Sequence, residues 1–170
     1  VGGVRGGGEN TTGMPLKLPP GFSIEVFAKD LPGARVMAMD AHGGFYVTRT
    51  RQNRVTYLQV EDKKVVRQFD VFGEMSRPHG IVQDLKNPFA FYIAQEDKIV
   101  RVLTESGAPI AKLVNLPSGG EHFTRTIMFM PGAEPPVLLV SAGSSCNVCE
   151  EENGWRAALK FRYVPEQMFD

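Results

Sequence analysis

The sequence predicts an all-β fold that makes up part of a β-propeller, about three to four blades of a larger ring. A β-rich triplet recurs at residues 45, 91 and 138, which are 46 and then 47 residues apart. This spacing is close to the length of a four-stranded propeller blade. The chain also contains 18 Gly and 12 Pro in 170 residues, which is typical of a chain rich in strands and turns.

Each copy of the repeat begins with an apolar strand, followed by a polar turn and then the triplet. The triplets are Phe45-Tyr-Val, Phe91-Tyr-Ile and Leu138-Leu-Val. In the first two copies, two further strands follow the triplet, at residues 54–58, 64–69, 99–103 and 110–114. The pattern therefore predicts radial sheets rather than isolated hairpins.

Residues 1–17 are predicted to form a flexible lead-in, because they are rich in glycine and polar residues and show no alternation. The incomplete propeller domain is expected to span residues 18–170. Its first strand is predicted at residues 22–27, where apolar and polar side chains alternate after the turn at Pro19-Pro-Gly.

Composition and charge disfavour two classes of function. The 19 basic and 19 acidic residues give a formal net charge of zero, so nothing draws the chain as a whole to nucleic acid or to an anionic bilayer. No apolar run approaches the roughly 20 residues that a membrane-spanning helix needs. The sequence therefore predicts a globular domain with no nucleic-acid partner and no membrane span.

The length of the chain predicts an open ring. A propeller needs about four to eight blades to close around its axis. Blades of roughly 46 residues fill this chain with three blades and part of a fourth. Because an open ring leaves unpaired backbone groups and an apolar blade face in water, self-association through the open edge is expected.

Glu121 and His122 are the most informative residues for function, since they lie where a Gly-rich loop enters a predicted strand. An imidazole at the mouth of a strand can accept a proton near neutral pH, and the carboxylate beside it can bind a hydroxyl group. The strand is predicted at residues 123–127, with Phe123, Arg125 and Ile127 on one face. The alternative is a solvated Glu-His pair on a loop, and the spacing alone favours that alternative.

Two further candidates accompany this pair. Arg125 offers a planar guanidinium fork that can bind a carboxylate in bidentate fashion, or can pair with an acid on a neighbouring blade. His79 lies in Arg77-Pro-His-Gly-Ile, a position of the previous blade comparable with that of His122. This equivalence predicts that both histidines face one axial opening. The alternative for His79 is an ordinary loop residue, which is also what we expect of His42.

Cys146 and Cys149 form a Cys-x-x-Cys motif. A zinc site needs two further ligands, and the sequence offers no second cysteine pair and no well-spaced histidine pair. A thioredoxin-like site needs a βαβ unit, which the strand pattern contradicts. A local disulfide formed in an oxidising compartment is the remaining interpretation, with free thiols in a cytosolic protein as the alternative. No metal site is predicted within the chain.

Four segments carry a resemblance to a known family. They are Leu18-Pro-Pro-Gly-Phe-Ser-Ile-Glu-Val-Phe, Arg77-Pro-His-Gly-Ile, Leu116-Pro-Ser-Gly-Gly-Glu-His-Phe-Thr-Arg-Thr and Gly143-Ser-Ser-Cys-Asn-Val-Cys-Glu-Glu. Together they resemble the soluble quinoprotein glucose/sorbosone dehydrogenase family over residues 18–161, and the last two are the more specific. The resemblance implies a six-bladed propeller that binds pyrroloquinoline quinone (PQQ) and calcium. It also implies oxidation of a sugar or related alcohol, with electrons passed to an external acceptor.

The resemblance implies a role for each candidate residue. The histidine matching His122 is the general base that takes the hydroxyl proton while hydride passes to the quinone. Glu121 and His79 match positions that contact substrate, and Arg125 is predicted to bind the cofactor. The calcium ligands, and most of the basic residues that hold the quinone, are expected outside this chain. The family and the Cys-x-x-Cys motif together predict a periplasmic or secreted protein.

The sequence also departs from the family, and other functions stay open. Met130-Pro-Gly-Ala-Glu-Pro-Pro replaces the Pro-Asp-Gly-Lys turn of such blades, and the tail from Phe161 drifts from the pattern. A fragment or degenerate homologue is therefore one expectation. A non-catalytic propeller module that binds a saccharide or a protein through its loop face is another. A lactone-hydrolysing propeller, with calcium held by groups such as Glu121 and Asn147, is the third.

Overall fold

The all-β prediction is confirmed by the computed structural model, which describes residues 8–104, 109–143 and 157–162. Apart from one 3-10 turn, η1 (Thr50–Gln52), the regular elements of these residues are strands. The chain divides into two compact units, Val1–Leu31 and Pro32–Asp170. This division falls later than the boundary predicted after residue 17. Within the described ranges, no helix is long and apolar enough to cross a membrane.

The first unit contains a two-stranded parallel sheet of β1 (Glu9–Asn10) and β2 (Ser23–Ile24). Asn10 organises the chain after β1, because its Nδ2 donates to the carbonyl oxygens of Met14 and Leu16 at 2.8 and 3.0 Å. Within the described residues, regular structure therefore begins at Glu9, inside the predicted lead-in.

The strand predicted at residues 22–27 is shorter than expected, since only Ser23 and Ile24 pair with β1. The alternating side chains do not form a buried face: Phe22 is 64% exposed and Val26 is 40% exposed. An apolar alternation stabilises a strand only where one face is covered.

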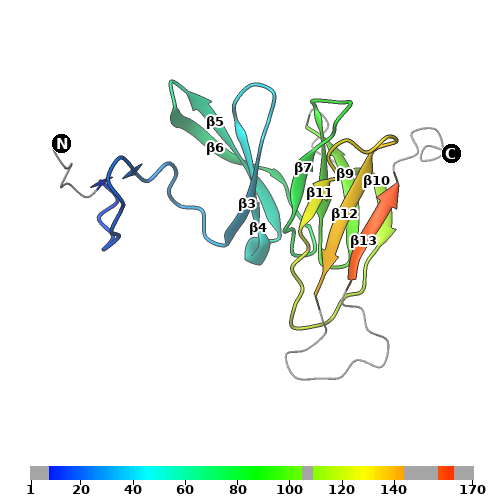
Figure 1. The fold of residues 1–170 in the computed structure, drawn as a ribbon. Helices are drawn as coiled ribbons and strands as arrows, with labels where there is room; N and C mark the ends of the chain where they lie inside the picture. Colours follow the sequence, from blue (N-terminus) through cyan, green and yellow to red (C-terminus); the bar gives the residue numbers. More distant parts are fainter. Residues whose placement is uncertain (1–7, 105–108, 144–156, 163–170) are drawn as a thin grey trace. The chain divides into compact units, whose positions relative to one another are not determined.

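The second unit consists of three antiparallel sheets in chain order (Figure 1). The first contains β3 (Ala34–Met39), β4 (Phe45–Arg49), β5 (Arg54–Glu61) and β6 (Lys64–Phe72). The second contains β7 (Ile81–Gln83), β8 (Ala90–Ala94), β9 (Lys98–Leu103) and β10 (Pro109–Asn115). The third contains β11 (Ile127–Phe129), β12 (Val137–Ala142) and β13 (Ala157–Arg162). The three predicted triplets lie in β4, β8 and β12, so the repeat is confirmed.

The sheets are arranged like neighbouring blades of a propeller. Hydrogen-bonded neighbours in every sheet are consecutive along the chain. The first strand of the middle sheet, β7, packs beside the first strands of the other two, β3 and β11. Four-stranded antiparallel sheets with their first strands together are the building plan of a propeller.

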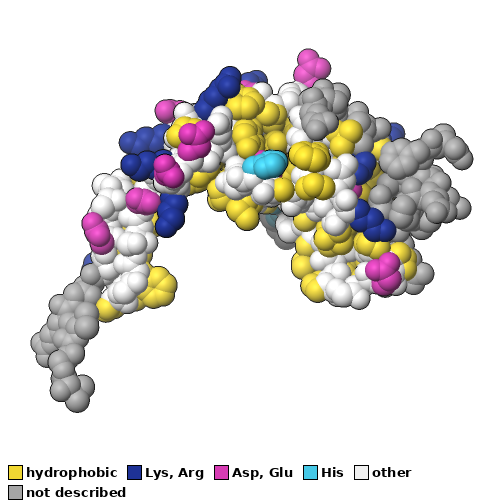
Figure 2. Space-filling model, turned by 90° about the horizontal axis from the view of Figure 1, so that it is seen from above, with side chains coloured by type: hydrophobic (Ala, Val, Ile, Leu, Met, Phe, Trp, Pro, Cys, Tyr) yellow, Lys and Arg dark blue, Asp and Glu magenta, His cyan; other side chains and the backbone are white. Residues whose placement is uncertain are grey.

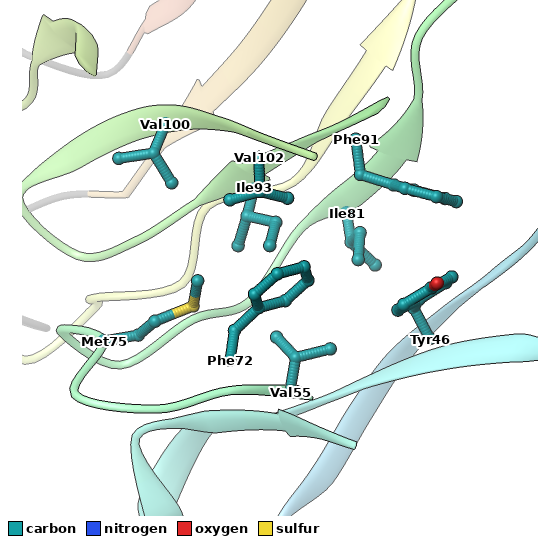
Figure 3. Packing of buried hydrophobic residues seen from close by; sticks show 9 residues of the cluster. All are labelled: Tyr46, Val55, Phe72, Met75, Ile81, Phe91, Ile93, Val100 and Val102. Carbon is teal, nitrogen blue, oxygen red and sulfur yellow. The ribbon is translucent and has the colours of Figure 1, made fainter. Parts of the chain in front are cut away.

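The middle sheet is covered on both faces, and β8 is buried along its whole length. Side chains alternate across a strand. Phe91 and Ile93 accordingly join the core shared with the first sheet, while Tyr92 joins the core shared with the third. Figure 3 shows Phe72 of the first sheet pointing toward the isoleucines of the second. An unbroken apolar strand is the pattern expected where both faces of a sheet are covered.

An aspartate closes the β7–β8 turn and forms a buried ion pair. Asp84 Oδ1 accepts the backbone N–H groups of Lys86 and Asn87 at 2.8 and 3.2 Å. Its Oδ2 accepts Nε–H of Arg101 on β9 at 2.8 Å, and the two side chains are 3% and 9% exposed. The pair therefore fastens the turn to the third strand of the sheet.

Gly80 lies where β7 approaches β11 most closely. A Cβ at this position would lie 2.5 Å from the carbonyl oxygen of Arg125 and 2.8 Å from the nitrogen of Ile127. Both are backbone atoms, so Gly80→Ala is expected to lower the free energy of unfolding by about 1–3 kcal/mol in urea denaturation. Gly73→Ala is the matched control, because a Cβ there would meet no atom within 4 Å. Equal stability of the two variants would contradict this account of Gly80.

Candidate functional site

A polar cleft of about 590 Å³ opens at the end of the sheets where β4, β6, β8 and β10 finish. It is lined by Asn53, Ser76, Arg77, Glu96, Gly119, Gly120 and Glu121. These residues come from the four connections β4–β5, β6–β7, β8–β9 and β10–β11. The first of these connections contains the short coiled turn at the end of β4 in Figure 1. Consecutive antiparallel strands bring alternate connections to one end, and loops held by rigid sheets are where sites are usually built.

Glu96 holds two of these connections together. Its Oε1 accepts the backbone N–H of Gly119 at 3.1 Å, and its Oε2 pairs with the guanidinium of Arg77 at 3.3 Å. Its own N–H donates to the carbonyl oxygen of Ser76 at 2.9 Å. The Glu96 side chain lines the cleft and is only 13% exposed, so it belongs to the wall of the cleft and not to its rim.

Arg77 stands at the rim in a fixed backbone conformation. Its N–H donates to Oδ1 of Asn53 at 3.1 Å, and its guanidinium carbon lies 4.6 Å from the centre of the Phe123 ring. Its φ is 46°, in the left-handed region that is costly for a residue with a Cβ. Such strain is concentrated at functional sites. The side chain is still 50% exposed, so the guanidinium is accessible to a ligand.

His79 lies directly before β7 and is fixed by three contacts. Its N–H donates to the carbonyl of Ala94 at 2.9 Å, and its carbonyl accepts the hydroxyl of Thr48 at 2.8 Å. Its ring Nδ1 lies 3.2 Å from the carbonyl oxygen of Arg125. A carbonyl oxygen only accepts, so Nδ1 carries the proton and Nε2 of the neutral ring is an acceptor.

Partial burial lowers the pKa of His79. The hydrogen bond to the Arg125 carbonyl opposes this shift, while the charges of Arg35 and Arg125 add to it. The folded-state pKa is therefore below the unfolded value of about 6.5. Between the two values the unfolded chain binds more protons than the folded chain. The contribution of His79 to the free energy of unfolding is therefore fully present above about pH 6.5 and is lost as the pH falls through the folded-state pKa.

The His79→Asn variant tests this pH dependence. Asparagine places a donor near the position of Nδ1 but does not titrate. The urea midpoint of the wild-type protein is expected to fall between about pH 7 and pH 5 more steeply than that of the variant. Identical slopes in the two proteins would show that His79 does not contribute.

The side chain of Arg125 binds three backbone carbonyl groups of its own connection, between β10 and β11. Its Nη1 donates to the carbonyl oxygens of His122 and Thr124 at 2.8 and 3.0 Å, and its Nη2 donates to that of Pro117 at 2.6 Å. The residue is buried, which lowers the pKa of its guanidinium, and the charge of Glu96 opposes this shift. Among the described residues, the buried Nε has no hydrogen-bond partner. The contact of Arg125 with a cofactor stays a prediction.

The strand predicted at residues 123–127 is wrong over most of its length, because β11 begins only at Ile127. The side chain of Arg125 takes up carbonyl groups that a strand would present to a neighbouring strand. The apolar alternation therefore reflects a loop with a buried arginine rather than a longer strand.

Glu121 is exposed and lines the cleft. His122 follows on the same connection, is half-buried, and offers its carbonyl to Arg125. Gly143, directly after β12, lies against His122: a Cβ there would be 2.7 Å from the His122 Cβ. The structure thus brings His79, His122 and Arg125 into one linked region, and of the predicted site residues it places Glu121 in the cleft wall.

Three residues of the cleft, Asn53, Arg77 and Glu96, are not among those predicted from the sequence. Arg77 belongs to the motif Arg77-Pro-His-Gly-Ile, and Glu96 stands in a polar run directly after the buried strand β8, so a signal was present for both. The predicted Cys146–Cys149 disulfide and Asn147 lie outside the described residues. Within the described ranges, no group of three or more His, Cys, Asp or Glu side chains could hold a metal ion.

Comparison with known proteins bears on the fold. No protein-family model matches the sequence, and a comparison with curated proteins gives no match. The holo form of the PQQ domain of pyranose dehydrogenase from Coprinopsis cinerea is similar in structure, with a TM-score of 0.64 and 19% identity over 74% of this chain and 31% of that chain. This chain has the fold of that PQQ domain. The resemblance predicted from the motifs is confirmed at the level of the fold.

Two further structures share the fold. A calcium structure of a Trichoderma reesei enzyme of carbohydrate-active family AA12 has a TM-score of 0.61 and 19% identity, over 70% of this chain and 31% of that chain. A gluconolactonase from Xanthomonas campestris has a TM-score of 0.56 and 18% identity, over 75% of this chain and 40% of that chain. The chain spans about a third of the length of the PQQ domain and of the AA12 enzyme. Fold alone does not decide between their activities.

Proposed function

We propose that this chain forms the substrate-binding part of a quinoprotein dehydrogenase that oxidises a sugar or a related alcohol. The polar cleft carries the proposal. Its charged side chains are the carboxylates of Glu96 and Glu121 and the guanidinium of Arg77. Carboxylates accept hydrogen bonds from hydroxyl groups, and a guanidinium donates to hydroxyl or ring oxygens. A neutral, hydroxyl-rich ligand suits this set.

Each site residue has a role in the proposal. Glu121 accepts a hydrogen bond from a sugar hydroxyl at the rim of the cleft. His122 takes the proton of the hydroxyl on the carbon that is oxidised, as a general base. Nε2 of His79 offers a second acceptor. Arg125 acts as a positioning residue, because its three bonds to carbonyl oxygens fix the connection that carries Glu121 and His122.

The described residues do not by themselves fit PQQ or calcium. The cleft has one basic side chain against two acidic ones, which disfavours a quinone that carries carboxylates. The described ranges also hold no cluster of metal ligands. We therefore place the calcium ligands and most of the groups that bind PQQ in further blades of a six-bladed ring, together with the route to an external electron acceptor, while a contact of Arg125 with the cofactor stays a prediction. A periplasmic or secreted location, with the disulfide, belongs to the same proposal.

The test uses a protein that contains this chain within a whole ring. Sugar-dependent reduction of a dye that requires both PQQ and calcium is the expected result. Hydrolysis of gluconolactone with calcium and without PQQ would overturn the proposal in favour of a lactonase. Saccharide binding with no turnover of either kind would overturn it in favour of a non-catalytic module.

A further inference from the structure

A second cleft, of about 330 Å³, lies at the opposite end of the sheets from the polar cleft. The first sheet contributes Tyr46, Tyr57 and Phe69 to its lining, and the second contributes Phe89 and Thr104. Figure 2 shows hydrophobic side chains gathered on the face that carries the β3–β4 and β7–β8 turns. The proposed sugar oxidation does not use this cleft.

Three aromatic rings from neighbouring strands line one wall at angles to one another. The rings of Tyr46 and Tyr57 have centres 4.8 Å apart and are inclined by 46°, and those of Tyr57 and Phe69 are 5.5 Å apart and inclined by 63°. Phe69 is 38% exposed, and Phe89 on the other wall is 42% exposed. Inclined rings on two sides of the cleft can surround a compact group, whereas parallel exposed rings would favour a flat one that stacks on them.

Asp40 provides a carboxylate whose hydrogen bonds are already made. Its Oδ1 accepts the backbone N–H groups of His42 and Gly44 at 2.8 and 2.9 Å, and its Oδ2 accepts the hydroxyl of Tyr57 at 2.9 Å. Gly44 has no side chain, which lets the phenol of Tyr57 reach this turn: a Cβ there would overlap the Tyr57 hydroxyl. Hydrogen bonds from neutral groups leave the negative charge of Asp40 in place.

The repeat shows what is missing at Asp40. In the second sheet the equivalent Asp84 meets the guanidinium of Arg101, so its charge is compensated. In the first sheet the third strand offers Asp40 the neutral phenol of Tyr57, and Asp40 has no ion pair within the described ranges. The first sheet therefore has the carboxylate of this turn, Asp40, but no cationic side chain in the position that Arg101 takes in the second sheet.

The two tyrosines of the cleft stay neutral. Burial, followed by the hydrogen bond and the charge of Asp40, raises the pKa of Tyr57 to about 12. Burial raises the pKa of Tyr46, and the hydrogen bond with Thr104 opposes this shift. The polar groups of Tyr46, Tyr57 and Thr104 are thus engaged within the protein. The cleft retains aromatic ring faces, the imidazole of His42 and the carboxylate of Asp40.

We propose that this cleft binds a quaternary or methylated ammonium group, held by the aromatic rings and the charge of Asp40. Ring faces attract cations within about 6 Å of their centres. Arg67 already uses Phe69 in this way, with its guanidinium carbon 4.8 Å from the ring centre. A methylated ammonium group needs charge and contact area but no hydrogen-bond acceptor. A sugar needs several acceptors and donors, and apart from the His42 imidazole the polar side chains of this lining already bond within the protein.

The probe is tetramethylammonium chloride, titrated into the full 170-residue chain and followed by the NMR amide signals of His42 and Gly44. Sodium chloride at equal ionic strength serves as the salt control. Saturable shifts with the organic cation, absent with sodium, are the expected result.

Asp40→Asn tests the charge, because asparagine keeps an acceptor for the turn. It is expected to weaken binding by about tenfold or more. Asp62→Asn in the exposed β5–β6 turn removes a charge outside the cleft and is expected to leave affinity unchanged. Phe89→Ala, at a side chain that is 42% exposed, is expected to weaken binding several-fold, which keeps the test valid if Asp40→Asn does not fold.

Two results would overturn the proposal. One is equal affinity of the wild-type chain, Asp40→Asn and Phe89→Ala for tetramethylammonium. The other is saturation of the same amide signals by methyl glucoside with no response to tetramethylammonium, which would make the cleft a saccharide site. Neither result bears on dye reduction at the polar cleft, so the two proposals can fail independently.

Discussion

His122→Ala in the whole-ring protein is expected to lower kcat for sugar-dependent dye reduction by about 10²–10⁴-fold, with a much smaller change in KM. The variant removes the group proposed to take the hydroxyl proton. Arg125 binds the carbonyl oxygen of His122, not its ring, so the connection retains its bonds to Arg125. The loss therefore falls on the chemical step.

Ser118→Ala is the matched control for His122→Ala. Ser118 is exposed on the same connection, and the cleft begins with Gly119. Steady-state kinetics of the two variants, measured with PQQ and calcium in excess, separate a role in proton transfer from a general disturbance of the connection. Unchanged kcat in His122→Ala would remove this residue from the mechanism.

Asp84→Asn is expected to lower the free energy of unfolding by about 3–5 kcal/mol, measured by urea denaturation. Asparagine can still accept the N–H groups of the β7–β8 turn. The buried guanidinium of Arg101, however, then faces an amide in place of a carboxylate. Removing one partner of a buried ion pair is strongly destabilising, because the remaining charge stays buried without its counter-charge.

The double variant Asp84→Asn/Arg101→Met distinguishes the charge from the turn. Methionine buries a similar length of chain without a charge, so the double variant is expected to recover most of the lost stability. Asp62→Asn, at an exposed position with φ of 48° that asparagine tolerates, is expected to leave stability unchanged. A double variant as unstable as Asp84→Asn would assign the loss to the turn.

The strands were predictable where short-range patterns decide them. The triplets at Phe45, Phe91 and Leu138 lie in the second strands of their sheets, which are largely buried, and a run of apolar residues is the pattern expected of a buried strand. Residues 22–27 and 123–127 show the limit. Their alternation is just as clear, but an uncovered face in one and the buried Arg125 in the other prevent a long strand.

The site was predictable only in part, for a related reason. Glu121 stands in a Gly-rich loop before a strand, and this local signal does place it in the cleft. Arg77 and Glu96 become site residues through contacts that cross between connections, with Asn53 and Gly119 as partners. A single sequence places Arg77 in a motif and Glu96 after a buried strand, but it does not show the contacts that join them to other connections.

The double coverage of β8 also has a kinetic consequence. Amide hydrogens of a strand enclosed by sheets on both sides exchange with solvent only when the enclosing sheets separate. Gln95 directly follows β8 and is itself 2% exposed, and its side chain accepts the N–H of Ser76 at 2.6 Å. We therefore expect the polar cleft to be anchored to a segment that opens late, and to stay formed while the outer strands fray.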